Sequence, residues 1–314
     1  MKRLKQSGNA SPGWVLSAPA FLWWSFFFLL PVLAIVYFSL ADKGGYAAEQ
    51  AVLFNDLDLD NYANSLTGPF FAVFLITMRT AIVGTLTALL VGFPVAYTVA
   101  TAVRRKWQPV LLFLLILPFW TSFLLRTFAW RIILAPEGPL SMFLQTVGVL
   151  SSPLGILDTQ AAVQLGIIYN YLPLSVFPIY AALDRIDPRT REASIDLGAG
   201  RIRTFIEITL PLAAPGIAGA AMLIFVLAAG DYVNPAILGG AQGLLVGQLI
   251  AIQILASQNL PLGAAMAVVL IALLGMVALT VWLLVLAVKR AMKWVWDPGV
   301  HADRKVLTER GSHA

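Results

Sequence analysis

Six long apolar stretches in the sequence constrain its fold more than any other feature. They lie at residues 15–40, 71–102, 110–134, 161–183, 213–238 and 264–288. Because a helix rises ~1.5 Å per residue and the hydrocarbon core of a bilayer is ~30 Å thick, about twenty apolar residues suffice for one crossing. Only 12% of the residues are charged, against about 25% in a typical soluble domain. The sequence therefore predicts an all-α, polytopic membrane protein with six transmembrane helices.

The first apolar stretch follows Met-Lys-Arg-Leu-Lys, so a secretory signal peptide has to be considered. The stretch is longer than the apolar region of such a signal, and no small-residue cleavage site follows it, so we interpret it as a retained helix. Cysteine is absent, and the two histidines lie in the C-terminal tail at His301 and His313. No metal site is expected. We attribute the excess of basic residues to the orientation of the chain in the membrane and not to nucleic-acid binding.

Basic residues are distributed unequally between the hydrophilic segments. Seventeen of the 21 Lys and Arg residues lie in one alternating set of segments, which comprises the N-terminus, residues 103–109, residues 184–212 and the C-terminal tail. The other set, residues 41–70, 135–160 and 239–263, contains only Lys43. Since basic loops stay on the cytoplasmic side, the asymmetry predicts that both termini are cytoplasmic.

The segment from Asp184 to Pro211 is polar although apolar stretches flank it. Asp187 and Pro188 are typical of a helix start, where the aspartate caps free amides and proline is tolerated. Gly198 and Gly200 permit a sharp turn after this first helix. A second amphipathic helix is predicted to follow, and Leu210-Pro211 is predicted to end it. The segment therefore predicts a compact two-helix projection on the cytoplasmic side.

Within this segment the order Glu-Ala-Ala, three residues, Gly, nine residues, Ile-x-Leu-Pro resembles the cytoplasmic signature of permease subunits in bacterial ABC importers. It stands here as Glu192, Ala193, Ser194, Gly198, Ile208, Leu210 and Pro211, with serine in place of the second alanine. The resemblance implies the type I importer permease fold. It also implies that residues 188–211, hereafter the coupling segment, dock on an ATPase subunit.

The chain contains no Gly-x-x-x-x-Gly-Lys-Ser/Thr loop, so the sequence predicts no catalytic ATP site of its own and no enzymatic activity. The resemblance implies that a separate ATPase uses ATP and Mg. It further implies a second permease subunit, two ATPase subunits and an extracytoplasmic solute-binding protein as partners in the bacterial inner membrane. The predicted regions are a cytoplasmic N-terminal segment (1–14), a first helix with a periplasmic loop (15–70), a permease core (71–290) and a cytoplasmic tail (291–314).

A second stretch, residues 229–240, reads Ala-Gly-Asp-Tyr-Val-Asn-Pro-Ala-Ile-Leu-Gly-Gly, and Leu262-Gly263-Ala264-Ala265 follows at the start of the last apolar run. This combination is similar to the permeases of spermidine/putrescine importers. The resemblance covers residues 15–290 and implies a polyamine as the transported solute.

The residues around this stretch are compatible with a cationic solute. Asp231 is the only acid in a predicted span, where an ionised side chain needs a partner or water. Ammonium groups also bind to aromatic faces. The predicted pathway residues are Asp231, Tyr232, Asn234, Trp120, Phe123, Tyr169, Asn170 and Tyr171. Alternatively, Asp231 neutralises Arg79, Arg126 or Arg131, and the aromatic residues only pack or anchor the helices.

Two other functions remain open from the sequence. Within the importer class the cargo could instead be an opine, a phosphonate, ferric ion, a sugar or an amino acid. An ion-coupled secondary transporter would need ion sites at unwound helices in paired repeats. The sequence shows one acid in its spans and no clear repeat, which disfavours that alternative.

Overall fold

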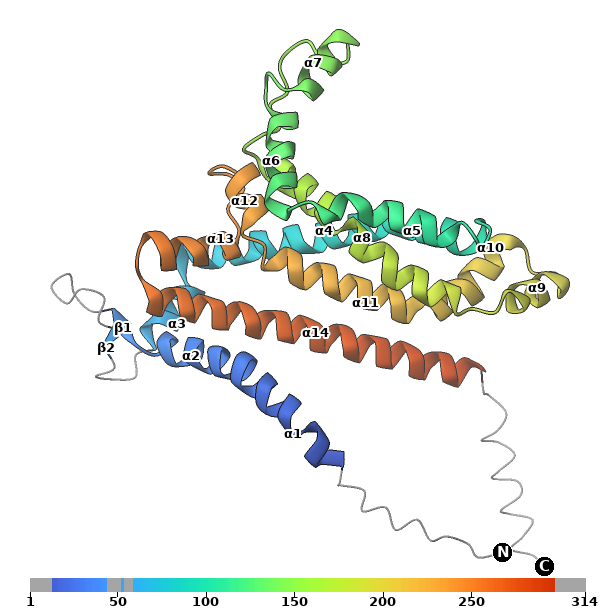
Figure 1. Ribbon diagram of the computed structural model, residues 1–314, viewed down its shortest axis with the longest axis horizontal. Coiled ribbons are helices and arrows are strands. Elements are labelled where there is room, and N and C mark those ends of the chain that lie inside the picture. Colours follow the sequence, from blue (N-terminus) through green and yellow to red (C-terminus); the bar gives the residue numbers. More distant parts are fainter. Residues whose placement is uncertain (1–12, 44–51, 54–58, 297–314) are drawn as a thin grey trace, which may run out of the picture. The chain divides into compact units, whose positions relative to one another are not determined.

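The computed structural model describes residues 13–43, 52–53 and 59–296, and helices make up nearly all of it (Figure 1). The helices are α1 (Gly13–Trp24), η1 (Ser25–Leu29), α2 (Leu30–Ser39), α3 (Asp60–Leu66), α4 (Gly68–Thr101), α5 (Gln108–Ile116), η2 (Leu117–Trp120), α6 (Phe123–Leu134), α7 (Pro139–Thr146), α8 (Gln160–Asp184), α9 (Pro188–Asp196), α10 (Arg201–Thr204), η3 (Phe205–Thr209), α11 (Leu210–Ala229), α12 (Val233–Leu238), α13 (Val246–Ala251), η4 (Ile252–Ala256) and α14 (Leu260–Trp296). Two strands of two residues each, β1 (Asp42–Lys43) and β2 (Val52–Leu53), pair antiparallel.

Five helical segments in the described part of the chain are long and apolar enough to cross a membrane. They are Ser17–Ser39, Phe70–Thr101, Gln160–Asp184, Arg201–Ala229 and Leu260–Leu284. A sixth candidate consists of two helices with a sharp bend between them. The all-helical, polytopic fold predicted from the apolar runs is thereby confirmed.

The predicted third span, residues 110–134, is not one straight helix. Gln108–Trp120 and Phe123–Thr146 meet at an angle of 83° (Figure 1). Pro118 has no N–H to continue the helical bonding, and the Thr121 hydroxyl donates to the Pro118 carbonyl at 2.7 Å. Thr121 and Ser122 then adopt extended ψ angles. The bend results because proline and a side-chain hydrogen bond replace the backbone bonds of a continuous helix.

The predicted fifth span, residues 213–238, is shorter at its C-terminal end than expected. Helix α11 ends at Ala229, and the chain starts again as α12 at Val233. Asp231 lies in the connection, where its Oδ1 accepts from the amides of Val233 and Asn234 at 2.9 and 3.1 Å. Asp231 therefore lies between two helices and not within one continuous helical span, and its side chain caps the second helix.

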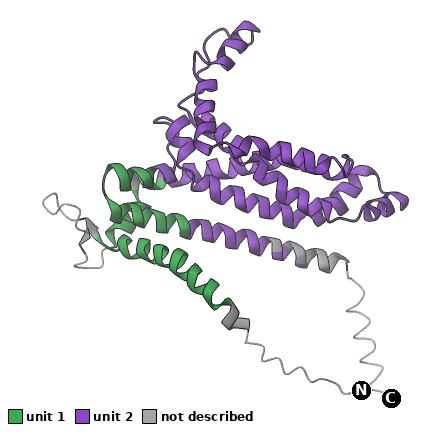
Figure 2. Ribbon diagram, in the orientation of Figure 1, with its two compact units in different colours: residues 1–71, 249–271 green, residues 72–248, 272–314 purple. Residues whose placement is uncertain are grey.

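The chain divides into two compact units (Figure 2). Unit 1 consists of residues 1–71 and 249–271, and unit 2 of residues 72–248 and 272–314. Within unit 1, Asn61 on α3 donates to the carbonyl of Ala41 at 2.8 Å, which holds α3 to the end of α2. Most of the two predicted cytoplasmic ends, residues 1–12 and 297–314, lies outside the described residues.

Helices α4, α8 and α11 form the centre of unit 2. Many of their buried side chains are small or β-branched, including Ala88, Ile167, Ile179 and Ile224. Glycines occupy the tightest contacts. A Cβ on Gly216 of α11 would lie 2.7 Å from the Pro178 carbonyl of α8. Small residues allow helix backbones to approach closely, which favours packing where lipid surrounds the helices.

Helices α8 and α11 run side by side in Figure 1 and are connected at one end through α9 and α10. At their other end they meet α12, which packs against α6 and α8. Ala162, Ile237, Leu238 and Leu134 form the buried cluster at this second end. The two predicted functional segments thus lie at opposite ends of one helical hairpin.

Candidate functional site

The coupling segment begins as the sequence predicted. Helix α9 starts at Pro188, and the Asp187 carboxylate accepts from the amide of Arg189 at 3.0 Å. This cap satisfies a donor that the first helical turn leaves free. The predicted helix start at Asp187-Pro188 is confirmed.

Helix α9 ends in a two-bond cap that requires a left-handed residue. Gly198 donates to the Ile195 carbonyl at 2.9 Å, and Ala199 donates to the Ser194 carbonyl at 3.0 Å. This pair of bonds is the Schellman arrangement. Gly198 has φ +87°, and a Cβ at this position would meet no atom within 4 Å. The glycine is thus needed for its backbone angle and not for space.

The signature residues of α9 point in different directions. Ser194 is buried, and its hydroxyl lies 3.0 Å from that of Thr204 on α10. Glu192 and Ala193 are exposed. Because a small residue at position 194 faces the second helix, α9 can pack closely on α10. Glu192 remains available to a partner.

The second helix of the coupling segment does not end at Leu210-Pro211, contrary to the prediction. Helix α10 passes through the π-helical turn η3 directly into α11, so the helical segment continues from Arg201 to Ala229. The amide of Leu210 donates to the carbonyl of Phe205, five residues earlier. This wider turn stands immediately before Pro211, which has no N–H and would crowd the carbonyl four residues before it. The helix therefore accommodates the proline instead of stopping.

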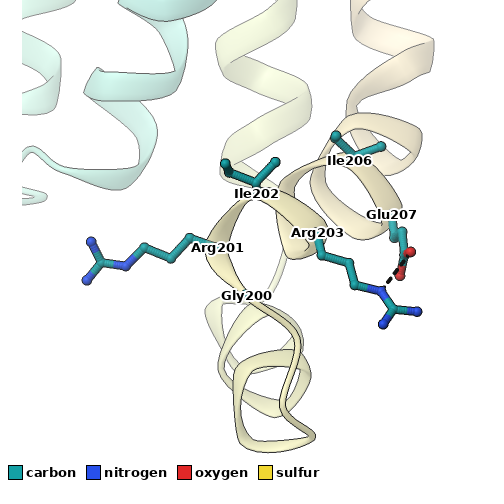
Figure 3. A pocket seen from close by; sticks show the side chains of 6 residues that line it. All are labelled: Gly200, Arg201, Ile202, Arg203, Ile206 and Glu207. Atoms are coloured by element: carbon teal, nitrogen blue, oxygen red, sulfur yellow. Dashed lines mark hydrogen bonds and ion pairs between the residues drawn. The ribbon is translucent and has the colours of Figure 1, made fainter.

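Exposed apolar side chains gather on the outside of the coupling segment. An open pocket of about 840 Å³ lies beside α10. Figure 3 shows the side chains that line it, which include Ile202, Ile206 and the ion pair between Arg203 and Glu207. Leu197, at the end of α9, is 87% exposed. Of the other signature residues, Leu210 is exposed and Ile208 is half-buried. Apolar residues exposed beside charged ones are typical of a protein-docking surface.

At the opposite end of the hairpin, Asp231 is 5% exposed and accepts hydrogen bonds on both oxygens. Besides the two amides at the start of α12, the Tyr171 hydroxyl donates to Oδ2 at 3.2 Å and the Asn234 side chain donates to Oδ2 at 2.5 Å. Four donors therefore surround one carboxylate. Such a set stabilises a buried carboxylate and holds it as a structural cap of α12.

Asn234 extends this arrangement to α6 and α8. Its Oδ1 accepts from Thr127 at 3.3 Å and from Asn170 Nδ2 at 3.2 Å, and all three side chains are buried. The five residues Thr127, Asn170, Tyr171, Asp231 and Asn234 are hereafter the polar network. A network whose members satisfy one another fixes the positions of the helices that carry it.

The alternative in which Asp231 neutralises an arginine is not found in the part of the chain that the structure describes. Arg131 pairs with Asp158 at 3.4 Å and donates to the Ile237 carbonyl at the end of α12. Arg79 is exposed on α4. Arg126 donates to Asn170 Oδ1 at 3.3 Å and so touches the polar network without contacting Asp231.

The predicted pathway aromatics form contacts on α6, α8 and the bend before α6. Phe123 stacks on Tyr171 with centroids 6.3 Å apart, and Tyr169 stacks on Phe119 at 6.0 Å. Trp120 and Tyr232 are 73% and 56% exposed. Phe123, Tyr169, Asn170 and Tyr171 therefore share one region, which Asn170 connects to Asp231 and Asn234 through the polar network.

Four contributors to these two regions did not stand out in the sequence. Thr127, Thr204, Phe119 and Trp130, whose ring lies 5.3 Å from that of Tyr169, sit in ordinary helical patterns. Arg126 did carry a signal, because an arginine inside an apolar run requires polar partners. The signal did not reveal which partners these would be.

Comparison with known proteins gives a consistent assignment. Residues 88–294 match the family described as "Binding-protein-dependent transport system inner membrane component". The spermidine/putrescine transport system permease protein PotB of Escherichia coli (strain K12) is 36% identical over 260 residues, which cover 83% of this chain and 93% of that protein. The corresponding protein of Haemophilus influenzae is 34% identical, with 82% of this chain and 88% of that protein covered.

A solved structure supports the fold independently of sequence. A chain of a bacterial ABC transporter involved in the import of the acidic polysaccharide alginate superposes with a TM-score of 0.63 over 89% of this chain and 95% of that chain. The sequence identity of this pair is 16%, so the likeness concerns the fold alone.

Proposed function

The chain belongs to the inner membrane components of binding-protein-dependent transport systems, as a permease subunit of an ABC importer, and from this membership we propose that it transports a polyamine. The assignment of a polyamine as cargo rests on the 36% sequence identity with a spermidine/putrescine permease, in an alignment that covers 83% of this chain. A polyamine presents ammonium groups joined by methylene chains, and the aromatic and amide side chains near the polar network suit both parts.

The protein acts within a larger complex in this proposal. A second permease provides the other half of the pathway, two ATPase subunits bind and hydrolyse ATP with Mg, and an extracytoplasmic binding protein delivers the solute. The exposed apolar residues of the coupling segment support the ATPase contact. The excess of basic residues in one set of segments supports placing both termini in the cytoplasm.

The continuous helix from Arg201 to Ala229 connects the coupling segment mechanically to the polar network. Force applied to the coupling segment reaches α11 without a flexible hinge between them, and α9 is joined to α8 through only three residues, Arg185–Asp187. Movement of the ATPase subunits therefore tilts α8 and α11 together. Helix α8 carries Asn170 and Tyr171 near its middle, and Asp231 follows the end of α11, so the polar network moves with these helices and changes access to the pathway.

Uptake by the reconstituted complex tests the cargo. Radiolabelled putrescine and spermidine are offered to proteoliposomes containing the permease pair, the ATPase subunits and the binding protein. We expect ATP-dependent accumulation that unlabelled polyamines suppress and that opines, phosphonates, ferric ion, sugars and amino acids leave unchanged. Competition by one of the other solutes and not by polyamines would assign the cargo to that class. Accumulation driven by an ion gradient without ATP would contradict an ATP-driven importer.

A further inference from the structure

The Arg126 guanidinium lies in a set of neutral groups that is suited to bind a cation. Arg126 Nη1 donates to the carbonyls of Pro118 and Thr121 at 3.2 and 3.0 Å, and Nε donates to Asn170 Oδ1 at 3.3 Å. The guanidinium carbon lies 4.5 Å from the ring centroid of Phe119 and 5.9 Å from that of Phe123. These five residues, Pro118, Phe119, Thr121, Phe123 and Asn170, are hereafter the Arg126 cradle.

The cradle contains no acidic side chain that would neutralise the charge of Arg126. In the described residues the ion pairs of arginine are Arg105–Asp184, Arg131–Asp158 and Arg203–Glu207, and Arg126 is in none of them. Its positive charge is held by carbonyl oxygens and ring faces alone. Replacing this cation by another cation of the same charge would leave the local electrostatic balance unchanged.

The bend between α5 and α6 creates this set of acceptors. Where the helix is broken, the carbonyls of Pro118 and Thr121 lose their helical donors and point to a common side chain. Asn170 contributes the third oxygen from α8, 44 residues away in the sequence. Three oxygen acceptors match the three N–H donors of a primary ammonium group.

We propose that the Arg126 cradle is a binding site for a primary ammonium group of the solute, and that Arg126 occupies it in the conformation of this structure. This inference rests on the proposed transport of a polyamine and names the groups that bind it. When Arg126 swings out, one ammonium takes its place on Pro118 O, Thr121 O and Asn170 Oδ1. The return of Arg126 displaces the solute. Arg126 is therefore a tethered competitor that keeps the site from remaining occupied.

The surroundings extend the fit beyond one ammonium group. Tyr169 stacks on Phe119 at 6.0 Å, Trp130 meets Tyr169 edge-on at 5.3 Å, and Trp120, the residue after Phe119, is largely exposed. The rings of Phe119 and Phe123 lie against the guanidinium, and together with the neighbouring aromatic side chains they can cover part of the methylene chain between two ammonium groups. Asp231 is not required for this contact, because its oxygens are already bonded to four donors.

Chemical rescue of Arg126→Ala tests the proposal. The variant is purified as the complete transporter in lipid nanodiscs, and its thermal melting is followed with propylammonium or methylguanidinium, with 1-propanol and N-methylurea as neutral controls of similar size. We expect a saturable rise in melting temperature of several degrees in Arg126→Ala with the two cations alone. The wild-type complex and Arg126→Lys, whose own cation fills the cradle, should not respond.

Two further variants keep the test decisive. Arg126→Gln, which retains a polar side chain, replaces Arg126→Ala if the alanine variant does not assemble, and the same rescue is expected. Adding Phe119→Leu to the responsive variant removes one ring face and should weaken the apparent cation affinity at least about fivefold, the order that a cation–π contact provides. Absence of rescue in a folded arginine variant, or equal rescue in the wild type, would overturn the proposal.

The rescue is distinguishable from the cargo experiment because propylammonium and methylguanidinium are not the transported solute. If cations rescue the variant but the complex takes up a non-cationic solute, the cradle is still a cation site and the polyamine assignment is rejected. Polyamine uptake without cation rescue would keep the cargo and reject the cradle.

Discussion

Single residues at the polar network have roles that their chemical type alone did not reveal. Asp231 is an acid next to a predicted cation pathway, yet its carboxylate caps α12 and binds Tyr171 and Asn234. Arg126 is a cation next to the same pathway, and it occupies the acceptors that suit a solute ammonium. At this scale hydrogen-bond partners, and not formal charge, decide which group is free to bind a ligand.

We expect Asp231→Asn to destabilise the protein even without solute. Asparagine can still cap α12 through its oxygen, but its NH₂ group then faces the Asn234 NH₂ that donates to the aspartate. Two facing donors leave buried groups unsatisfied, at a cost of about 1–3 kcal/mol in the free energy of unfolding. Thermal melting of the nanodisc complex measures the loss.

Tyr171→Phe is the matched control, since it removes a single hydrogen bond to the same carboxylate. Its cost should be smaller, about 1 kcal/mol. If Asp231→Asn melted like the wild type but lost polyamine uptake, Asp231 would be a solute ligand and not a cap.

The two short helices of the coupling segment are separated by two glycines with different backbone angles. The α9 cap requires Gly198 at φ +87°, whereas Gly200 starts α10 with an ordinary φ of −67°. A Cβ on either glycine would meet no atom within 4 Å. The two positions therefore differ in backbone conformation and not in packing, which makes them a matched pair for substitution.

Gly198→Ala should destabilise the coupling segment by about 1–2 kcal/mol, because an L-residue in the left-handed region brings its Cβ close to the following carbonyl. Solute-stimulated ATPase activity of the reconstituted complex should fall while membrane insertion is retained. Gly200→Ala should have little effect on either measurement. If Gly198→Ala and Gly200→Ala lost equal ATPase activity, the left-handed turn at Gly198 would not be the reason for the loss, and contact of both residues with the partner would explain it.

The α8–α11 contact offers a second comparison at the scale of helices. Gly216→Ala places a methyl group 2.4 Å from the Ala182 Cβ and 2.7 Å from the Pro178 carbonyl, so the two helices have to separate. Overpacking of this kind costs about 1–3 kcal/mol. Gly219→Ala on the same helix meets nothing within 4 Å and should be neutral or stabilising by up to about 1 kcal/mol, since alanine favours helix more than glycine does. Melting temperatures of the two variants decide the comparison.

In the proposed function, the coupling segment contacts the ATPase subunits and the polar network lines the pathway, with α8 and α11 running between them. Arg201 to Ala229 is one helical segment, and α8 packs along it. We therefore expect a movement of the coupling segment to reach the polar network as a tilt of packed helices. The proposed orientation places the coupling segment in the cytoplasm and the segment between α7 and α8 outside.

Single cysteines test this orientation directly, because the natural sequence contains none. We expect Lys106→Cys to react with a membrane-impermeant maleimide only in inside-out vesicles, and Ser152→Cys only in right-side-out vesicles. Both positions are exposed, so burial does not limit the reaction. The reverse labelling pattern would place the coupling segment on the wrong side for an ATPase and would contradict the proposed function.

The sequence alone determined the membrane class, most of the helical spans and the start of the coupling segment. Each of these depends on residues close together in the chain, such as an apolar run of one helix or Asp187 beside Pro188. A proline can end, bend or continue a helix, so its presence did not decide the outcome; the structure shows a bend near Pro118 and a continuous helix through Pro211. Only the tertiary structure decided that Asp231 and Arg126 have separate partners. Asp231 meets Tyr171 across 60 residues and Arg126 meets Asn170 across 44. Contacts at that separation arise from helix packing, and neither periodicity nor local spacing encodes them.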